Sequence, residues 1–359
     1  MATSASSSRE YYPSSVPRPY TDSKLKHLAG TKADPAKKSL FSAAKQVVDY
    51  TPAIGTEIVG LQLKDLNEQQ AEDLALLIAE RGVVFFRDQD LTPEQQRELG
   101  LRWGNINAQV TGRGAQAQPF PFPDVQVFRT DKNSLQAPNR WHQDHSANET
   151  PASITFLMVR ETPPNGGGDT VWSSLYSAYD KLSPAFRARL EGLETLQEGA
   201  YQPHDASYVP MRGTHPLIRT HPVTRWRHLY VNDSWAKQVK GFRREESDLL
   251  INFLQQHISS GVDYQVRFKW TPNSVALWDN RSTQHSAIWD FFPETRYGTR
   301  VVVHGDKSFF DPKSKSRAEA LGIPITPSWR RDIANGLEDV VGRDAWVLQG
   351  FKQKPYGSL

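Results

Sequence analysis

The chain has 359 residues, enough for one large domain or two small ones. Hydrophobic residues make up 38% of it and aromatic residues 11%, so a substantial core can form. Its 43 basic residues are nearly balanced by 40 acidic ones, which gives no indication of nucleic acid binding. There are no cysteines, which excludes disulfides, thiolate metal sites and a cysteine nucleophile.

The sequence gives no sign of membrane insertion or export. No apolar run approaches the roughly 18 residues that span a bilayer, and the N-terminus carries no apolar signal-peptide core. The absence of cysteine fits a reducing compartment. We therefore expect a soluble, cytoplasmic protein with no membrane contact and no nucleic acid partner.

The N-terminal part is predicted to change from a tail to regular structure. Residues 1–40 are rich in Ser, Pro, Lys and Tyr without periodicity, which indicates a flexible tail. A short strand is predicted at 58–61. The helical spacing of apolar residues after Asn67 predicts a helix that ends at Gly82, followed by a buried strand at 83–86.

The elements that follow are mostly short strands. Residues 92–95 have the form of a capping box with proline first, so a second helix should run to about residue 102. From 109 to 138 the chain is rich in Gly, Gln, Pro and Phe, which indicates a long loop, often a functional lid. The other predicted helices are 184–193 and 244–258, and the other strands are 153–159, 170–173, 229–232, 264–269, 275–278 and 299–304.

Many short strands with few helices are typical of a mainly β fold with peripheral helices, a sandwich or barrel, and not of alternating βαβ units. We expect three regions: the tail over 1–40, one domain over 41–310 and a C-terminal extension over 311–359. The extension, with an amphipathic stretch at about 330–341, should pack on the domain or at a subunit contact.

Two separated clusters hold side chains suited to a metal. On an extended strand His142 and Asp144 point to the same face. With His285 they supply two imidazoles and a carboxylate, the facial triad that holds Fe(II) and leaves positions open. The neighbouring His145 also allows a hydrolytic zinc site, but the chain has no HxH or HExxH motif.

Two arginines follow the second cluster. Arg296, Gly298 and Arg300 share one face of a strand, with the arginines about 13 Å apart at about 3.3 Å per residue. One arginine can then hold the distal end of a dicarboxylate while the other faces a ligand nearer the metal. The alternative is a pair of surface arginines on an edge strand. An inward-facing pair requires anionic partners, because burying an unpaired charge is costly.

Several motifs recur in order over roughly residues 50 to 305: GVVFFRDQ at 82–89, WHQD at 141–144, PPNGGGDT at 163–170, HPLIRTHP at 215–222, LYVN at 229–232 and WDNR at 278–281, continuing to Arg300. With these motifs the chain resembles the taurine dioxygenase (TauD/TfdA-like) family of Fe(II)/2-oxoglutarate oxygenases. Within that family it is most similar to fungal sulfonate dioxygenase-type members.

The resemblance implies a fold, cofactors and roles for single residues. The family fold is a double-stranded β-helix (jelly roll, cupin-like). Fe(II), the co-substrate 2-oxoglutarate and O2 are the implied cofactors. The implied roles are iron ligation by His142, Asp144 and His285, binding of the distal carboxylate of 2-oxoglutarate by Thr170 and Arg296, and contact with an anionic substrate group by Arg300.

One departure from the family concerns the substrate. Where sulfonate-utilising relatives carry a histidine, this chain has Gly-Asn-Ile-Asn-Ala-Gln at 104–109, so Asn107 or Gln109 would stand in its place. Asp144 is present where halogenating relatives have a small residue, which favours hydroxylation.

We therefore expect oxidation, most simply hydroxylation, of a small anionic carboxylate, amino acid or sulfonate, with release of succinate and CO2. One alternative is desaturation, cyclisation or epimerisation of a specialised metabolite at the same centre. Another is a non-catalytic jelly-roll binding protein. A homo-oligomer, dimer or tetramer, is an open option.

Overall fold

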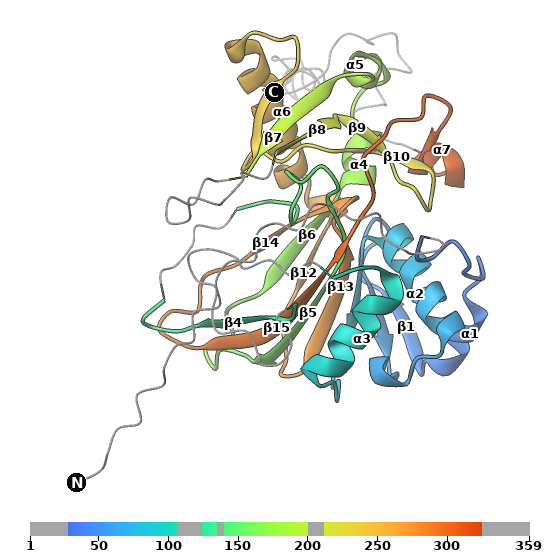
Figure 1. Ribbon diagram of the computed structural model, residues 1–359, viewed down its shortest axis with the longest axis vertical. Coiled ribbons are helices and arrows are strands. Elements are labelled where there is room, and N and C mark those ends of the chain that lie inside the picture. Colours follow the sequence, from blue (N-terminus) through green and yellow to red (C-terminus); the bar gives the residue numbers. More distant parts are fainter. Residues whose placement is uncertain (1–27, 107–123, 135–139, 200–211, 325–359) are drawn as a thin grey trace, which may run out of the picture. The chain divides into compact units, whose positions relative to one another are not determined.

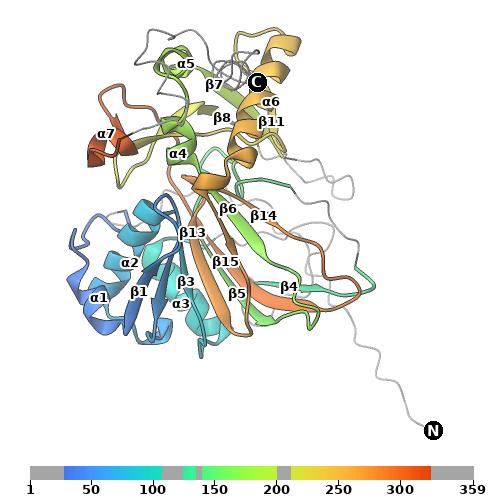
Figure 2. The same cartoon turned by 180° about the vertical axis from the view of Figure 1, so that it is seen from behind.

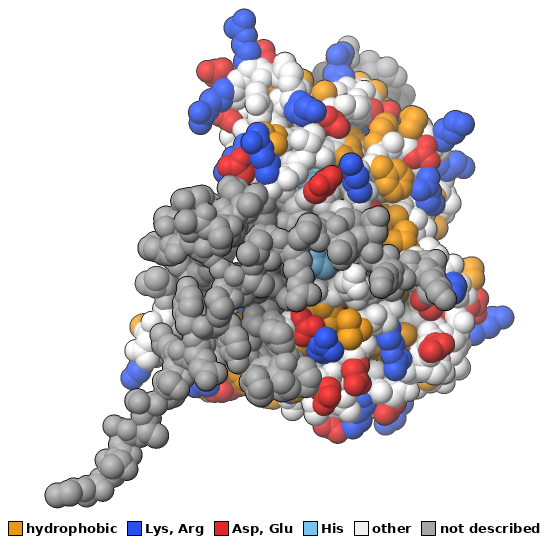
Figure 3. Space-filling model, viewed as in Figure 1, with side chains coloured by type: hydrophobic (Ala, Val, Ile, Leu, Met, Phe, Trp, Pro, Cys, Tyr) orange, Lys and Arg blue, Asp and Glu red, His pale blue; other side chains and the backbone are white. Residues whose placement is uncertain are grey.

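The computed structural model describes residues 28–106, 124–134, 140–199 and 212–324. The chain divides into two compact units, Met1–Arg317 and Ala318–Leu359. No helix among the described residues has the length and apolar character that a membrane crossing requires. On the described part of the face in Figure 3, basic and acidic side chains are interspersed.

The largest element of the structure is a seven-stranded sheet in the order β1-β2-β3-β13-β5-β15-β4, antiparallel except for the β2–β3 pair. A second, three-stranded sheet has the order β12-β6-β14. The strands of these two sheets are β1 (Gln46–Asp49), β2 (Thr56–Val59), β3 (Val83–Phe86), β4 (Gln126–Thr130), β5 (Ala152–Glu161), β6 (Thr170–Ser174), β12 (Gln265–Phe268), β13 (Ser274–Asp279), β14 (Thr283–Ala287) and β15 (Arg296–His304).

Two smaller sheets, β16-β10-β9 and β11-β7-β8, complete the described strands. Their strands are β7 (Glu194–Glu198), β8 (Arg212–Pro216), β9 (Ile218–Thr220), β10 (Trp226–Leu229), β11 (Ala236–Val239) and β16 (Lys315–Ser316). The helices are α1 (Lys38–Ala43), α2 (Glu68–Arg81), α3 (Pro93–Trp103), α4 (Leu175–Asp180), α5 (Pro184–Leu190), α6 (Arg244–Ser260) and α7 (Arg317–Leu321), with 3-10 turns at Leu63–Asp65 and Val262–Tyr264.

The central strands of the main sheet are buried on both faces. In β3, Val84 and Phe86 pack in one apolar cluster with residues of α2 and α3, whereas Val83 and Phe85 pack with residues of β6 and β12. Figures 1 and 2 show the same layers, with α1–α3 on one side of the sheet and β6 and β14 on the other. This two-sided burial explains why β3 is a continuous apolar run in the sequence.

The helix signals in the N-terminal half are confirmed. The Asn67 side chain accepts from the backbone of Gln70 and completes a capping box at the start of α2. The helix ends before Gly82, which has a φ of 74°. A second capping box, at Thr92, starts α3. The expected mainly β architecture with peripheral helices is therefore confirmed.

The long loop expected over 109–138 contains a strand, so that expectation is wrong for the described part. β4 forms the edge of the main sheet, and its Gln126 pairs with Arg300 of β15. The hydrophobic pattern does not reveal this strand, because its one buried residue is polar: Gln126, which is 8% exposed. Residues 107–123 and 135–139 lie outside the described part.

Residues 28–40 are ordered, whereas we expected the tail to continue to residue 40. Leu40 is fully buried in the cluster that contains α2, and the backbone N–H of Gly30 donates to Glu72 over 2.9 Å. The strand expected at 229–232 was also wrong, because β10 ends at Leu229. Leu229, Tyr230 and Val231 form an apolar run because all three are buried, although only the first lies in a strand. The amphipathic stretch at about 330–341 lies outside the described residues.

Candidate metal centre

His142 and His285 are brought together by their main chains. The backbone N–H of each residue donates to the carbonyl oxygen of the other over 2.9 Å, which makes an isolated antiparallel bridge beside β14. Their rings follow the same geometry, with centroids 4.2 Å apart. Directly opposed residues on paired strands are close neighbours, so the bridge sets the spacing of the two imidazoles.

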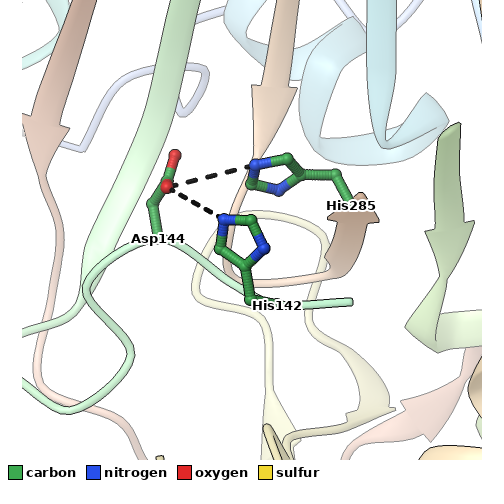
Figure 4. A group of neighbouring side chains, drawn as sticks. All are labelled: His142, Asp144 and His285. Carbon is green, nitrogen blue, oxygen red and sulfur yellow. Dashed lines mark ion pairs between the residues drawn. The ribbon is translucent and has the colours of Figure 1, made fainter. Parts of the chain in front are cut away.

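Asp144 completes the group. Its Oδ1 lies 3.7 Å from Nε2 of His142 and 4.0 Å from Nε2 of His285, as Figure 4 shows. One ligand atom from each of the three residues lies within 4.8 Å of the other two, a spacing that suits a metal ion. Within the described chain, these three form the sole cluster of this kind.

The local backbone differs from the extended strand that we expected. His142 is a single bridge residue, and Asp144 begins a turn in which His145 has a φ of 54°. Gln143 does point away from the metal group, because its amide donates to the carbonyl oxygen of Asn280 over 2.7 Å. His145 is not part of the metal group. Nothing in the described geometry therefore favours the zinc alternative.

The protonation states suit metal ligands. Burial opposes the ionisation of Asp144, but the permanent positive charge of Arg300 outweighs it, with a further contribution from His285 and His142 when they are protonated. The pKa of the carboxyl therefore lies well below its usual range. Burial, with His142 nearby, lowers the pKa of His285 to about 3. Nδ1 of His142 lies 3.0 Å from the carbonyl oxygen of Arg140, which makes Nδ1 the protonated nitrogen and leaves Nε2 for a metal.

Arg300 reaches the metal group from β15. Its Nη1 donates to Oδ1 of Asp144 over 3.1 Å, and its Nε donates to the Gln126 side chain over 2.9 Å. Its side chain is 25% exposed, so part of it remains accessible. An arginine held in this way can meet an anionic group next to the metal.

Arg296 lies four residues before Arg300, at the start of the same strand and beside Thr170. Its Nη2 donates to the Thr170 hydroxyl over 3.4 Å, and its guanidinium lies 5.3 Å from the ring of Phe128 and 5.5 Å from that of Trp270. Nε is buried without a hydrogen-bond partner in the described structure. A buried guanidinium of this kind requires an anion, such as a carboxylate.

Strand register places Thr170 near the metal group. On β6, Trp172 pairs with His285 and Thr170 pairs with Ala287, so Thr170 lies opposite a residue two positions along β14 from His285. Asn107 and Gln109, the other expected substrate residues, lie outside the described part of the chain.

Sequence reasoning missed residues that support the centre from behind. The hydroxyl of Thr155 donates to Oδ2 of Asp144 over 3.0 Å, and the Asn280 amide donates to that hydroxyl over 2.7 Å. Asn280 stands in the WDNR motif, but its role depends on the β5–β13 register that pairs Thr155 with Trp278. No local pattern shows such a cross-strand relation.

Comparison with known proteins identifies the family. A family model described as "Taurine catabolism dioxygenase TauD, TfdA family" matches residues 46–302. The chain belongs to this family. It is 34% identical over 307 residues to an alpha-ketoglutarate-dependent sulfonate dioxygenase of Saccharomyces cerevisiae, covering 80% of this chain and 74% of the relative.

Two further similarities agree with this family. The chain is 36% identical over 289 residues to the alpha-ketoglutarate-dependent dioxygenase cnsM of Penicillium expansum, covering 74% of this chain and 79% of the relative. The crystal structure of a taurine dioxygenase from Burkholderia xenovorans superposes with a TM-score of 0.63 at 32% identity, covering 75% of this chain and 94% of the other.

These matches confirm the TauD/TfdA resemblance and the jelly-roll fold class. They also confirm the enzyme class, an alpha-ketoglutarate-dependent dioxygenase, which is an oxidoreductase. Relatives of this class use Fe(II), 2-oxoglutarate and O2, and the donor set of His142, Asp144 and His285 fits Fe(II).

Proposed function

We propose that this TauD-family chain holds Fe(II) through His142, Asp144 and His285 and oxidises a small anionic substrate, with 2-oxoglutarate as co-substrate. The observation that carries the proposal is the three-residue group, with all its ligand atoms within 4.8 Å and an arginine on its carboxylate. Bound Fe(II), with 2-oxoglutarate and O2, supplies oxidation of a substrate C–H bond coupled to decarboxylation of the co-substrate.

In this proposal Arg296 and Thr170 bind the distal carboxylate of 2-oxoglutarate. The unpartnered Nε of Arg296 and the adjacent Thr170 hydroxyl offer two donors, and Arg296 as a whole is only 5% exposed. Burial lowers the pKa of Arg296 only to about 10, so the side chain stays cationic at neutral pH. The rings of Phe128 and Trp270 exclude water and strengthen a charge-assisted bond.

Arg300 would bind the anionic group of the substrate close to the metal. It is tied to Gln126 by Nε and to Asp144 by Nη1, and this leaves Nη2 for an incoming anion. A sulfonate is the leading candidate, because the Saccharomyces cerevisiae relative is named a sulfonate dioxygenase. Carboxylates and sulfate esters present the same charge and similar acceptor oxygens, and Asn107 and Gln109 are proposed to help select among them.

The proposal is tested by anaerobic titration with Fe(II) and 2-oxoglutarate, followed by the visible charge-transfer band of the chelate. Alkylsulfonates, sulfate esters, amino acids and aryloxy acids are then added singly, and a shift of the band identifies the substrate class. His142→Ala should abolish the band and succinate formation. His257→Ala, which alters a partly buried histidine of α6, should retain both.

A wild-type protein that binds Fe(II) but gives neither band nor succinate would contradict the co-substrate assignment. Product mass spectrometry separates the outcomes. Hydroxylation adds one oxygen atom or, at the carbon that bears a sulfonate, releases an aldehyde and sulfite, whereas desaturation and cyclisation remove two hydrogen atoms and epimerisation leaves the mass unchanged. A homo-oligomer and a cytoplasmic location stay predictions, to be checked by light scattering and by imaging of a tagged chain.

A further inference from the structure

The two oxygens of the Asp144 carboxylate have different surroundings. Oδ1 faces the imidazoles of His142 and His285 and accepts a bond from Arg300. Oδ2 points the other way and accepts the hydroxyl of Thr155 over 3.0 Å. Both Asp144 and Thr155 are buried, at 5% and 0% exposed, so water does not compete for this bond.

The direction of the Thr155 bond is set by a chain of groups behind it. The indole N–H of Trp278 can only donate, and it donates to Oδ1 of Asn280 over 2.9 Å. The backbone N–H of Asp144 donates to the same oxygen over 3.2 Å. The Asn280 amide group therefore faces Thr155 with its nitrogen, which donates to the hydroxyl oxygen over 2.7 Å. The hydroxyl hydrogen is left to point at Asp144.

All four hydrogen-bonding positions of the Asn280 side chain are used. The amide nitrogen that donates to Thr155 also donates to the carbonyl oxygen of Ser153 over 3.3 Å. Asn280 is 1% exposed, and its backbone N–H donates to Ser153 as well, over 2.8 Å. Such a saturated buried amide has one orientation, because a flip would leave buried donors facing donors.

The geometry points to a role for Trp278, Asn280 and Thr155 as positioning residues that hold Oδ2 of Asp144 away from the metal. A metal held by this group would then meet Asp144 through Oδ1, and Oδ2 would not occupy a position that the co-substrate or O2 needs. This inference rests on the proposed function, because it takes Asp144 as a ligand. Groups that orient ligands from behind commonly change metal affinity 10- to 100-fold when they are removed.

The test compares Thr155→Val, which removes the hydroxyl at nearly constant shape, with Thr155→Ser, which retains it. Thr56→Val is the matched control, because Thr56 is also fully buried and donates to a carboxylate, Asp49, over 2.6 Å. Co(II) serves as the metal probe, since its visible absorption reports the number of ligands. Each variant is titrated without 2-oxoglutarate, and its thermal unfolding midpoint is measured.

We expect Thr155→Val to bind Co(II) roughly 10-fold more weakly and to change the Co(II) spectrum, because Oδ2 is free to join the metal. Thr155→Ser should restore the affinity and the spectrum. Thr56→Val should lower the unfolding midpoint without changing either. Asn280→Asp keeps the shape but makes the group facing Thr155 an acceptor, so the hydroxyl turns away and the same spectral change should follow.

Wild-type Co(II) affinity and spectrum in both Thr155→Val and Asn280→Asp would overturn the inference. Thr155 and Asn280 would then have only a structural role. That result is distinct from failure of the proposed function, in which the wild-type protein itself binds neither Co(II) nor Fe(II).

Discussion

At the scale of single residues, the surroundings of Arg296 suit a cation that binds an anionic ligand. Its guanidinium lies near two aromatic rings, those of Phe128 and Trp270, and has one neutral partner, the Thr170 hydroxyl at 3.4 Å, among the described hydrogen bonds. Asp169 is close enough to raise its pKa slightly against the effect of burial. That carboxylate is itself held by Arg267 over 2.7 Å, so Arg296 remains available.

Arg296→Gln should therefore weaken 2-oxoglutarate binding about 10- to 100-fold, because a hydrogen bond to a charged group contributes about 1.5–3 kcal/mol. The dissociation constant of 2-oxoglutarate is measured by titrating it anaerobically into the Fe(II)-loaded protein. Arg129→Gln is the matched control, since this arginine lies on neighbouring β4 with a side chain 52% exposed. Equal affinities in the two variants would remove Arg296 from the co-substrate site.

At the scale of elements, β15 carries Arg296 and Arg300 on one face. Gly298 lies between them because a side chain at this position would clash with its neighbours. A Cβ at Gly298 would lie 2.2 Å from the carbonyl oxygen of Met158 and 2.6 Å from the Phe128 ring. Phe128 therefore crosses over the glycine and reaches the guanidinium of Arg296. The strand can pair with β5 and support the aromatic ring only because this position has no side chain.

Gly298→Ala should lower the thermal unfolding midpoint by several degrees and weaken 2-oxoglutarate binding, because β15 must move away from β5 or displace Phe128. Differential scanning calorimetry and the chelate titration measure the two effects. A variant with wild-type values for both would show that the strand pair accommodates a methyl group and that the ring position is unimportant.

Elements with local signals could be predicted from the sequence, and elements without them could not. The caps Asn67 and Thr92 defined α2 and α3 because their hydrogen bonds lie within a few residues. β14 was missed because the buried side chains of Gln284 and its neighbours are polar: its amide donates to the carbonyl oxygen of Val231 and to the side chain of Gln255. A hydrophobic pattern cannot reveal a strand stabilised in this way.

The residues of the candidate site divide in the same way, into those with a local sequence signal and those without one. His142, Asp144 and His285 could be named because ligand type and motif spacing carry information about them. Thr155 was not named, because its contact with Asp144 exists only once β5 and β13 are paired in register. Propensity and composition say nothing about which side chains meet across a sheet.

At the scale of the whole molecule, buried neutral histidines that are not members of the metal group link stability to pH. Burial, with the charge of Arg219 nearby, lowers the pKa of His215 to about 4 and the pKa of His228 well below its ordinary value. In the unfolded chain both imidazoles have a pKa of about 6.5. The unfolded state therefore binds more protons below pH 6.5, and protonation favours unfolding.

The free energy of unfolding should be constant above about pH 6.5 and decrease as the pH falls towards about 4. His215 alone should contribute a loss of roughly 2 kcal/mol at pH 5. Urea unfolding of the metal-free protein at pH 7 and pH 5 measures the difference. His215→Gln should reduce it, and an equal pH dependence in variant and wild type would show that His215 titrates as in the unfolded chain.

The pair of backbone hydrogen bonds between His142 and His285 also has a consequence for biosynthesis. The two ligands come from distant parts of the chain, and the bridge that joins them forms only after β14 has been made. A ribosome-bound chain that ends before this strand has His142 and Asp144 but no third ligand. If the proposed function is correct, iron should therefore be acquired late, only after β14 has been synthesised, and incorporation of the metal would report that translation has passed His285.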